Sequence, residues 1–291
     1  KFMKFVKLFE PLKVGPVIVP NRIVMPAMGL HFGDTYDFTD RYKAFYRERA
    51  HGGVGLLGIG PLAIDLVGSA PGLPGIFEDR QIGPIKELID ELHRDTQAKL
   101  GTQLFQMGRS AFGQLTGLQP IAPSPVYSRI SRQMPREMTG TDIKEVQEAF
   151  AQATRRCREA GFDYVEAVGC TGYLISQFLS PVTNRRTDAY GGSLANRMRF
   201  GLEVIGKMKA VAGPDMAIGI RVAGNDFIEG GHGNDEQALF CAEAERAGAD
   251  AINVTGGWHE TNIPQLTANV PPGAYVYLAR GIKEKVGIPV F

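Results

Sequence analysis

A short phrase recurs along this 291-residue chain: an amphipathic polar stretch, then Ala-Gly or Gly-Gly, then a run of apolar and β-branched residues. Two copies, EAGFDYVEAVG at 159–169 and RAGADAINVTG at 246–256, agree at Ala-Gly-x-Asp, and HGGVGLLGIG at 51–60 is a third copy without the Asp. This order is typical of a helix, its C-cap glycine and a buried parallel strand. We therefore expect a chain in which helices and strands alternate.

Extending the pattern along the chain predicts seven strands with helices between them. The strands are expected near 22–26, 54–60, 100–106, 163–168, 217–222, 251–255 and 288–291, and the helices over 41–50, 84–99, 143–160, 194–211, 235–247 and 274–285. Within the second helix, Ile85, Leu88, Ile89 and Leu92 form a one-sided apolar stripe. Strict alternation with helix-length crossovers favours a parallel sheet.

Two parallel architectures satisfy this alternation, an open doubly wound sheet and a closed (β/α)8 TIM barrel. The open sheet predicts Gly-x-Gly-x-x-Gly directly after its first strand, but here that strand runs into Pro26, Ala27 and Met28. We therefore favour the barrel. An open seven-stranded barrel would expose two long apolar edges, so residues 1–291 are expected to form one barrel domain truncated within or after strand 7, with the eighth βα unit outside this sequence.

Charge and hydropathy limit the kinds of partner that the chain is expected to have. Lys and Arg number 32 against 31 Asp and Glu, and no basic stripe with interleaved aromatics occurs, so a nucleic-acid partner is not expected. No run of 18 apolar residues exists, and Lys1, Lys4, Lys7 and Glu10 interrupt the first ten residues. These features predict a cytoplasmic protein with no membrane partner.

The three cysteines do not form a recognisable framework. Cys157, Cys170 and Cys241 are separated by 13 and 71 positions, spacings that match neither paired disulfides nor a zinc or iron-sulfur site. We expect buried thiols and no metal site.

In a barrel of this kind the active site gathers at the carboxyl ends of the strands. That set holds Gln103, Arg221, Tyr173 and His259, but no Gly-x-Ser-x-Gly nucleophile, metal pair or paired carboxylates. An amide, a guanidinium, a phenol and an imidazole bind and polarise a planar heteroaromatic ligand well. The residue types therefore favour chemistry carried by a cofactor.

Several motifs then resemble the Old Yellow Enzyme family of FMN-dependent oxidoreductases, and the resemblance covers essentially the whole chain. They are LFEPLKVG near the start, NRIVMPAM at 21–28, the strand end at 103–109, GYLISQFLSPVTNRRTDAYGGSLANRMRF at 172–200, and Arg221. GGWHETNIPQLTANVPPGAY at 256–275 is similar to the 2,4-dienoyl-CoA reductase and 2-enoate reductase branch. Simple ene reductases carry a His and a second His or Asn where this sequence has Val168 and Thr171. The absence of that polar pair also favours the 2,4-dienoyl-CoA reductase and 2-enoate reductase branch.

The resemblance implies roles for named residues. It implies FMN contacts from Pro26, Ala27, Met28, Gly60, Gln103 and Arg221, catalysis by Tyr173 and His259, and substrate contacts from Arg109, Cys170 and Trp258. It also implies a 4Fe-4S cluster, FAD and NAD(P)H in parts outside this sequence. The implied reaction is reduction of a C=C bond conjugated to a carbonyl, in an enoyl- or dienoyl-CoA thioester, an aryl or polycyclic one included, or a 2-enoate.

Other interpretations stay open from the residues alone. The chain is also compatible with an amine dehydrogenase or demethylase of the same family, with a non-redox barrel lyase or isomerase, and with a silent scaffold. Its partner is a small-molecule substrate, and a homo-oligomer is left open. Among single residues, Arg221 has an alternative as the partner of a barrel acid, and His232 is expected to be solvated. Arg185, Arg186 and Asp188 are expected to form a structural ion-pair loop.

Overall fold

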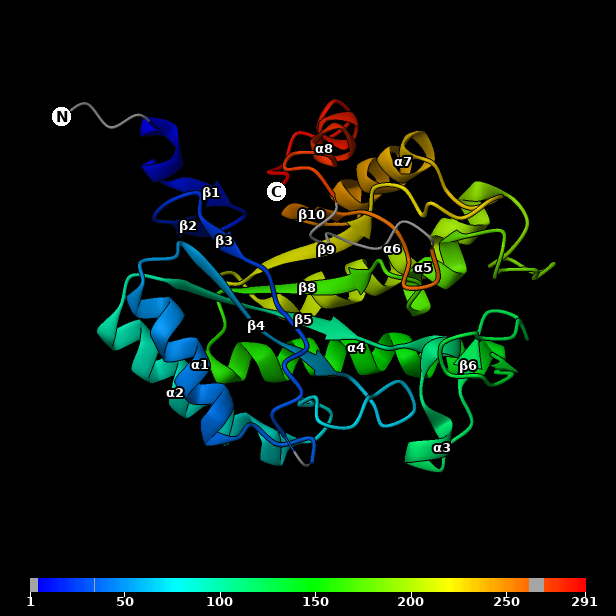
Figure 1. The fold of residues 1–291 in the computed structure, drawn as a ribbon, viewed down its shortest axis with the longest axis horizontal. Coiled ribbons are helices and arrows are strands. Elements are labelled where there is room, and N and C mark those ends of the chain that lie inside the picture. The colour runs from blue at the N-terminus through cyan, green and yellow to red at the C-terminus, as the bar shows by residue number, and fades with distance from the viewer. Residues whose placement is uncertain (1–4, 34, 262–269) are drawn as a thin grey trace.

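A parallel sheet that curls into part of a barrel forms the centre of the structure (Figure 1), a computed structural model describing residues 5–33, 35–261 and 270–291. Its six strands lie in the order β10-β9-β8-β5-β4-β3, and every neighbouring pair is parallel. The strands are β3 (Val24–Met25), β4 (Leu56–Ala63), β5 (Lys99–Phe105), β8 (Tyr164–Gly169), β9 (Ala217–Ala223) and β10 (Ala251–Thr255). Six of the predicted strands and the barrel class are thus confirmed.

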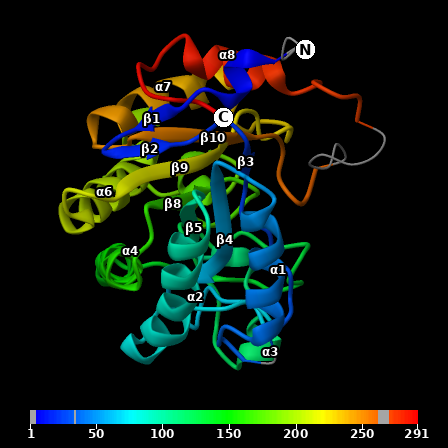
Figure 2. The ribbon, with the colours of Figure 1, turned by 90° about the vertical axis from the view of Figure 1, so that its left-hand side faces the viewer.

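Helices cover the outer face of this sheet, where they form an arc around the strands in Figure 2. They are α1 (Asp40–His51), α2 (Ile82–Asp95), α4 (Gly140–Ala160), α6 (Leu194–Ala212), α7 (Asn234–Arg246) and α8 (Val276–Lys283). In α2 the predicted stripe Ile85, Leu88, Ile89 and Leu92 is buried against the sheet side of the core. No helix in the described ranges has both the length and the apolar character that crossing a membrane requires.

The predicted second helix was too long at its C-terminus. Helix α2 ends at Asp95 because Thr96 is extended, and both its backbone N–H and its Oγ1 donate to the carbonyl of Leu92, at 2.9 and 2.8 Å. The chain then reaches Lys99, where β5 begins. By contrast, α4 ends as predicted at Ala160, because Gly161 takes the left-handed conformation, at φ 94°, that a helix C-cap favours.

The seventh predicted strand lies where expected but pairs only briefly. Val290 forms a single parallel bridge with Ile252 of β10, and the N–H of Ile252 donates to the carbonyl of Pro289 at 3.0 Å. Short elements that were not predicted are η1 (Val6–Phe9), β1 (Leu12–Val14), β2 (Val17–Val19), η2 (Asp79–Gln81), η3 (Gly108–Ser110), α3 (Gly113–Thr116), β6 (Ile121–Ala122), β7 (Arg136–Glu137) and α5 (Leu174–Leu179).

The interior of the curled sheet is layered. Near the amino ends of the strands, the β1–β2 hairpin packs Val14 and Val17 into a cluster with Leu56 and Tyr164. Near the carboxyl ends a second apolar cluster contains Phe105, Val168, Cys170 and Trp258. Between the two lies a layer of polar side chains, which is the first part of the candidate site.

Candidate active site

The polar layer is centred on the carboxylate of Glu166 in β8. Its Oε1 accepts from Gln103 Nε2 of β5 at 2.5 Å and from Asn253 Nδ2 of β10 at 3.0 Å, and its Oε2 accepts from the hydroxyl of Tyr164 at 2.7 Å. Burial raises the pKa of Glu166, and these donors together with the charge of Arg221 oppose that rise. The network fixes the side-chain amide of Gln103 inside the curled sheet, between the two apolar clusters.

Arg221 in β9 belongs to the same layer by register. It pairs with Val168 of β8 on one side and with Asn253 of β10 on the other. Its Nε atom is buried and has no hydrogen-bond partner among the described residues. A buried guanidinium nitrogen without a partner is costly, so this donor fits a ligand with acceptor atoms.

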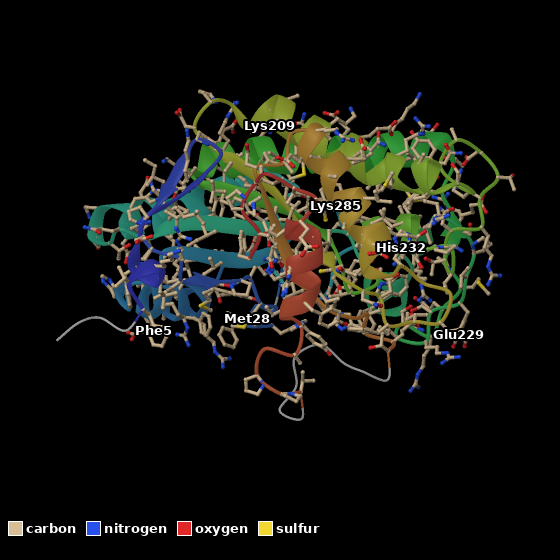
Figure 3. All side chains as sticks on the ribbon, turned by 90° about the horizontal axis from the view of Figure 1, so that it is seen from above. Phe5, Met28, Lys209, Glu229, His232 and Lys285 are labelled. Atoms are coloured by element: carbon tan, nitrogen blue, oxygen red, sulfur yellow. The ribbon has the colours of Figure 1, made fainter. Side chains whose placement is uncertain are left out.

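The other residues expected to touch a cofactor lie at the neighbouring strand ends. After β3, Ala27 is buried, whereas Pro26 and Met28 are exposed, as Met28 is drawn in Figure 3. In β4, Gly60 has φ 104°, and a Cβ there would lie 3.0 Å from the backbone nitrogen of Leu62. Only glycine adopts that backbone without strain. Together with Gln103 and Arg221, these residues can accept a flat ring that makes backbone contacts on one side.

Tyr173 and His259 come together from two different loops. Tyr173 is the N-cap of α5 after β8, and His259 follows β10; their ring centroids are 5.6 Å apart. Burial raises the pKa of Tyr173 to about 12. The side chain of His259 keeps an exposed part, but the protein atoms around it desolvate the imidazole and lower its pKa, and Glu260 opposes this. At neutral pH the pair therefore consists of a protonated phenol and a neutral imidazole.

A pocket of about 370 Å³ opens beside this pair. Tyr173 and His259 form part of its wall, and apolar side chains such as Leu73, Phe112 and Ile130 form much of the rest. Parallel strands bring their carboxyl ends to one edge of the sheet, which is why loops distant in sequence meet here. The pocket has the lining expected for a largely apolar ligand with one polar end.

The three residues expected to touch substrate lie deeper than Tyr173 and His259. Cys170 and Trp258 are 2% and 1% exposed and pack below the pocket. Burial raises the pKa of Cys170 to about 11, so it is a thiol at neutral pH. Arg109 is also buried, and its guanidinium forms an ion pair with Glu260 and donates to the carbonyl of Tyr127 at 2.7 Å.

Two expectations about other residues have clear outcomes. His232 is not solvated: it is 1% exposed, because the loop before α7 folds back over it. In the predicted ion-pair loop, the pair between Arg186 and Asp188 is confirmed, with Nη2 and Oδ2 2.6 Å apart, whereas Arg185 forms no ion pair with a described residue. Residues 262–269 of the motif that follows His259 lie outside the described residues.

Sequence reasoning assigned no role to four residues that support the site, namely Glu166, Asn253, Asp226 and Glu260. Glu166 had a signal, because a charged residue inside the buried strand Tyr-Val-Glu-Ala-Val needs partners. Asn253 occupies the corresponding place in Ala-Ile-Asn-Val-Thr. Asp226 and Glu260 stand in loops, and nothing in their local sequence indicates what they contact.

Comparisons with known proteins agree with this arrangement. The model of the NADH:flavin oxidoreductase / NADH oxidase family matches residues 7–275. The chain is 49% identical over 283 residues to a metal reductase of Desulforamulus reducens, covering 97% of this chain and 42% of the relative. It is 37% identical over 292 residues to an NADH oxidase of Thermoanaerobacter brockii, covering 98% and 44%.

A solved structure is similar over nearly the same extent. The complex of 2-naphthoyl-CoA reductase with 2-naphthoyl-CoA superposes with a TM-score of 0.94 at 31% identity, over 98% of this chain and 46% of that one. The chain thus spans less than half the length of each of these three proteins. By its sequence match and by its fold, the chain belongs to the NADH:flavin oxidoreductase / NADH oxidase family, the Old Yellow Enzyme family.

Proposed function

We propose that this chain binds FMN and reduces a C=C bond conjugated to a carbonyl, in an enoyl- or dienoyl-CoA thioester, aryl-CoA included, or in a 2-enoate. The observation that carries the proposal is the Tyr173–His259 pair in the wall of a largely apolar pocket beside the strand ends. The similarity to 2-naphthoyl-CoA reductase supports a flat acyl group as the reacting part. On the resemblance alone, we also propose that a 4Fe-4S cluster, FAD and NAD(P)H operate with residues outside this sequence.

The cofactor contacts follow from the polar layer. Arg221 and Gln103 would hold the polar edge of the ring, and Pro26, Ala27 and Gly60 would contact it through their backbones. Met28, which is 44% exposed, would lie at its rim. When bound, FMN supplies a hydride to the electron-poor carbon of the conjugated system. The unpartnered Nε of Arg221 supports its role, because a cation there stabilises negative charge on the ring.

Tyr173 would donate the proton that completes the reduction. With a pKa raised to about 12, its phenol keeps its hydrogen throughout the physiological range and can deliver it to the carbon that gains electron density. His259, neutral because its pKa is lowered, would donate an N–H hydrogen bond to the carbonyl oxygen. This arrangement would replace the polar pair that simple ene reductases carry at the positions of Val168 and Thr171.

The decisive experiment separates the two half-reactions by following flavin absorbance after rapid mixing. In Tyr173→Phe, FMN content and reduction by the electron donor should be unchanged, while reoxidation by an enoyl- or aryl-CoA should slow by roughly 10² to 10⁴, the usual range for a lost general acid. His259→Ala should show a smaller defect of the same kind. Tyr190→Phe is the matched control, since the hydroxyl of Tyr190 bonds to Glu203 away from the site. Reoxidation of Tyr173→Phe at the parent rate would refute the role of the phenol.

Two other reactions are tested in the same assay, with a cationic amine as the electron donor to the flavin and a metal ion as the electron acceptor from it. Oxidation of a cationic amine calls for an aromatic cage, and the pocket wall presents Phe112 and Tyr173 as its only phenyl-bearing side chains among the described residues. The acid next to His259, Glu260, is already paired with Arg109 and so does not balance the charge of a bound amine.

Reduction of a metal ion is a second candidate, favoured by the 49% identity to a metal reductase. A metal acceptor should reoxidise Tyr173→Phe as fast as the parent protein, because electron transfer to a metal ion needs no proton from the phenol.

A further inference from the structure

One indole ring supports both Tyr173 and His259. Trp258 directly precedes His259 and is 1% exposed. A Cβ added to Gly172 would lie 2.9 Å from the Cε3 atom of Trp258, so the indole packs directly against the backbone of the residue before Tyr173. Gly172 has φ 82°, and glycine is needed there for both the backbone and the space.

Backbone contacts join the same two segments. Thr171 and Trp258 form a parallel β-bridge, and the N–H of His259 donates to the carbonyl of Thr171 at 3.3 Å. The loop after β8 and the loop after β10 are therefore fixed to each other at the level of Trp258. A shift of the indole would move Tyr173 and His259 relative to each other.

The polar end of the indole has a single anchor, Asp226 in the loop after β9. The Nε1 atom of Trp258 donates to Asp226 Oδ1 at 2.8 Å. The other carboxylate oxygen accepts from the backbone N–H of His232 at 2.9 Å, and the N–H of Asp226 donates to the carbonyl of His232 at 3.0 Å. Both carboxylate oxygens are thus engaged, and the loop closes on itself before α7.

Figure 3 shows this loop from above, with exposed Glu229 at the rim and buried His232 further in, beside α7. Asp226 is 1% exposed, and burial raises its pKa to about 7. A carboxylate placed where burial disfavours its charge destabilises the fold unless its hydrogen bonds compensate. Packing alone would be served by an apolar side chain of similar size.

We propose that Asp226 is a positioning residue for the oxidative half-reaction: it fixes the indole of Trp258 and thereby the separation of Tyr173 and His259. The inference rests on the proposed function of that pair. It adds the loop after β9 to the loops after β8 and β10 that carry Tyr173 and His259.

The test uses Asp226→Ala and Asp226→Asn in the FMN-loaded full-length protein. A displacement of about 1 Å in a reacting group can lower a rate by roughly 10², so reoxidation by substrate should fall by about that factor in Asp226→Ala. Asp226→Asn keeps the size and one acceptor oxygen, so its defect should be smaller. FMN content and the rate of flavin reduction should stay at parent values in both. Asp163→Asn is the matched control: Asp163 is a partly buried acid, 13% exposed in its side chain, with several partners, but it lies beside Leu100 and Lys99 at the start of β5, away from the pocket.

A spectroscopic readout reports the anchor independently of turnover. With ¹⁵N-tryptophan labelling, the indole N–H signal of Trp258 is assigned by its disappearance in Trp258→Phe. It should shift and exchange faster with water in Asp226→Ala, and should not change in Asp163→Asn. A rate defect in Asp226→Ala that multiplies fully with that of Tyr173→Phe would indicate independent effects and overturn the proposal, because residues that act as one unit are not additive.

The outcomes separate this inference from the proposed function. If Tyr173→Phe is reoxidised at the parent rate, the proposed function and the positioning role both fail. If Tyr173→Phe is slow but Asp226→Ala reacts as the parent does, despite a shifted indole signal, only the positioning role is overturned. Equal losses in both half-reactions of Asp226→Ala would show a general structural defect and also overturn it.

Discussion

The ion pair between Arg109 and Glu260 offers a test of whether Arg109 serves substrate or structure. Its side chains are 5% and 11% exposed. Arg109 also donates to the carbonyl of Tyr127 at 2.7 Å, and Glu260 Oε1 accepts from the backbone N–H of Arg129 at 3.0 Å. The pair joins the loop after β5 to the residue that follows His259. The resemblance predicts a substrate contact for Arg109. The geometry gives both terminal nitrogens of its guanidinium internal partners, and among the described residues only the buried Nε lacks one.

The perturbation is Glu260→Gln, which leaves the cation of Arg109 buried. Burial lowers the pKa of Arg109, and Glu260 is the first group that opposes this. Removing one partner of a buried pair typically costs about 3 to 5 kcal/mol. At about 2 to 4 °C per kcal/mol for domains of 150 to 250 residues, the Tm should fall by roughly 6 to 20 °C. In Arg109→Met/Glu260→Gln both charges are gone, and most of the loss should be recovered.

The assay is thermal and urea unfolding of the two single variants and the double variant, together with KM for the substrate. Glu148→Gln is the control, because the Lys207–Glu148 pair is 43% and 53% exposed and such pairs contribute about 0 to 1 kcal/mol. If Arg109→Met raises KM while Glu260→Gln leaves unfolding unchanged and the double variant shows no coupling, the structural reasoning is refuted. Arg109 would then be a substrate ligand.

Three further predictions concern charge and pH. Arg221→Met should lower the flavin reduction potential and weaken FMN binding, since a hydrogen bond to a charged group is worth about 1.5 to 3 kcal/mol; an unchanged potential by dye equilibration would return Arg221 to a structural role. With the pKa of Tyr173 raised to about 12, the phenol stays protonated to pH 10, so substrate-dependent reoxidation should show no alkaline decline below that pH; a decline that disappears in Tyr173→Phe would contradict this. The pKa of Asp226 is raised from 3.8 to about 7 in the fold, so its contribution to stability is present below about pH 4 and is lost as the pH rises through 7. Relative to the parent protein, Asp226→Asn should therefore gain free energy of unfolding as the pH rises from 4 to 7, by up to about 1.4 kcal/mol per pH unit. Urea titrations that give the two proteins the same pH dependence of stability would contradict this.

The elements that could be predicted are those in which one local signal decides the conformation. The Ala-Gly phrase placed β8 and β10 to within a residue, because a left-handed glycine both ends the helix and starts the turn into the strand. Helix α5 could not be found in this way, since all six of its residues are buried and no polar face gives it a period. The β1–β2 hairpin did have a signal, the Gly-Pro between two alternating runs at 12–19, that was not used.

The residues of the candidate site likewise fall into those that the strand pattern predicts and those that it does not. Gln103, Arg221, Tyr173 and His259 could be named because each lies within a predicted strand or in the loop that follows one, on the side where a parallel barrel gathers its polar groups. Glu166 could have been added by register: once β5 and β8 are neighbours, Gln103 is opposite Glu166, and two buried polar side chains in that position must bond.

Asp226 and Glu260 belong to a different case, because their partners are 32 and 151 residues away. Neither contact follows from strand register, since both acids stand in loops whose course depends on the packing of Trp258 and Arg109. Nothing in the neighbouring sequence of either acid predicts its partner. Each of the two contacts nevertheless restricts the conformation of the segment that holds His259. The geometry of Tyr173 and His259 is therefore set by loop contacts that only the folded chain brings together. For that reason, substitutions outside the pocket, at Asp226 and Glu260, are the ones expected to reveal how the pair is held.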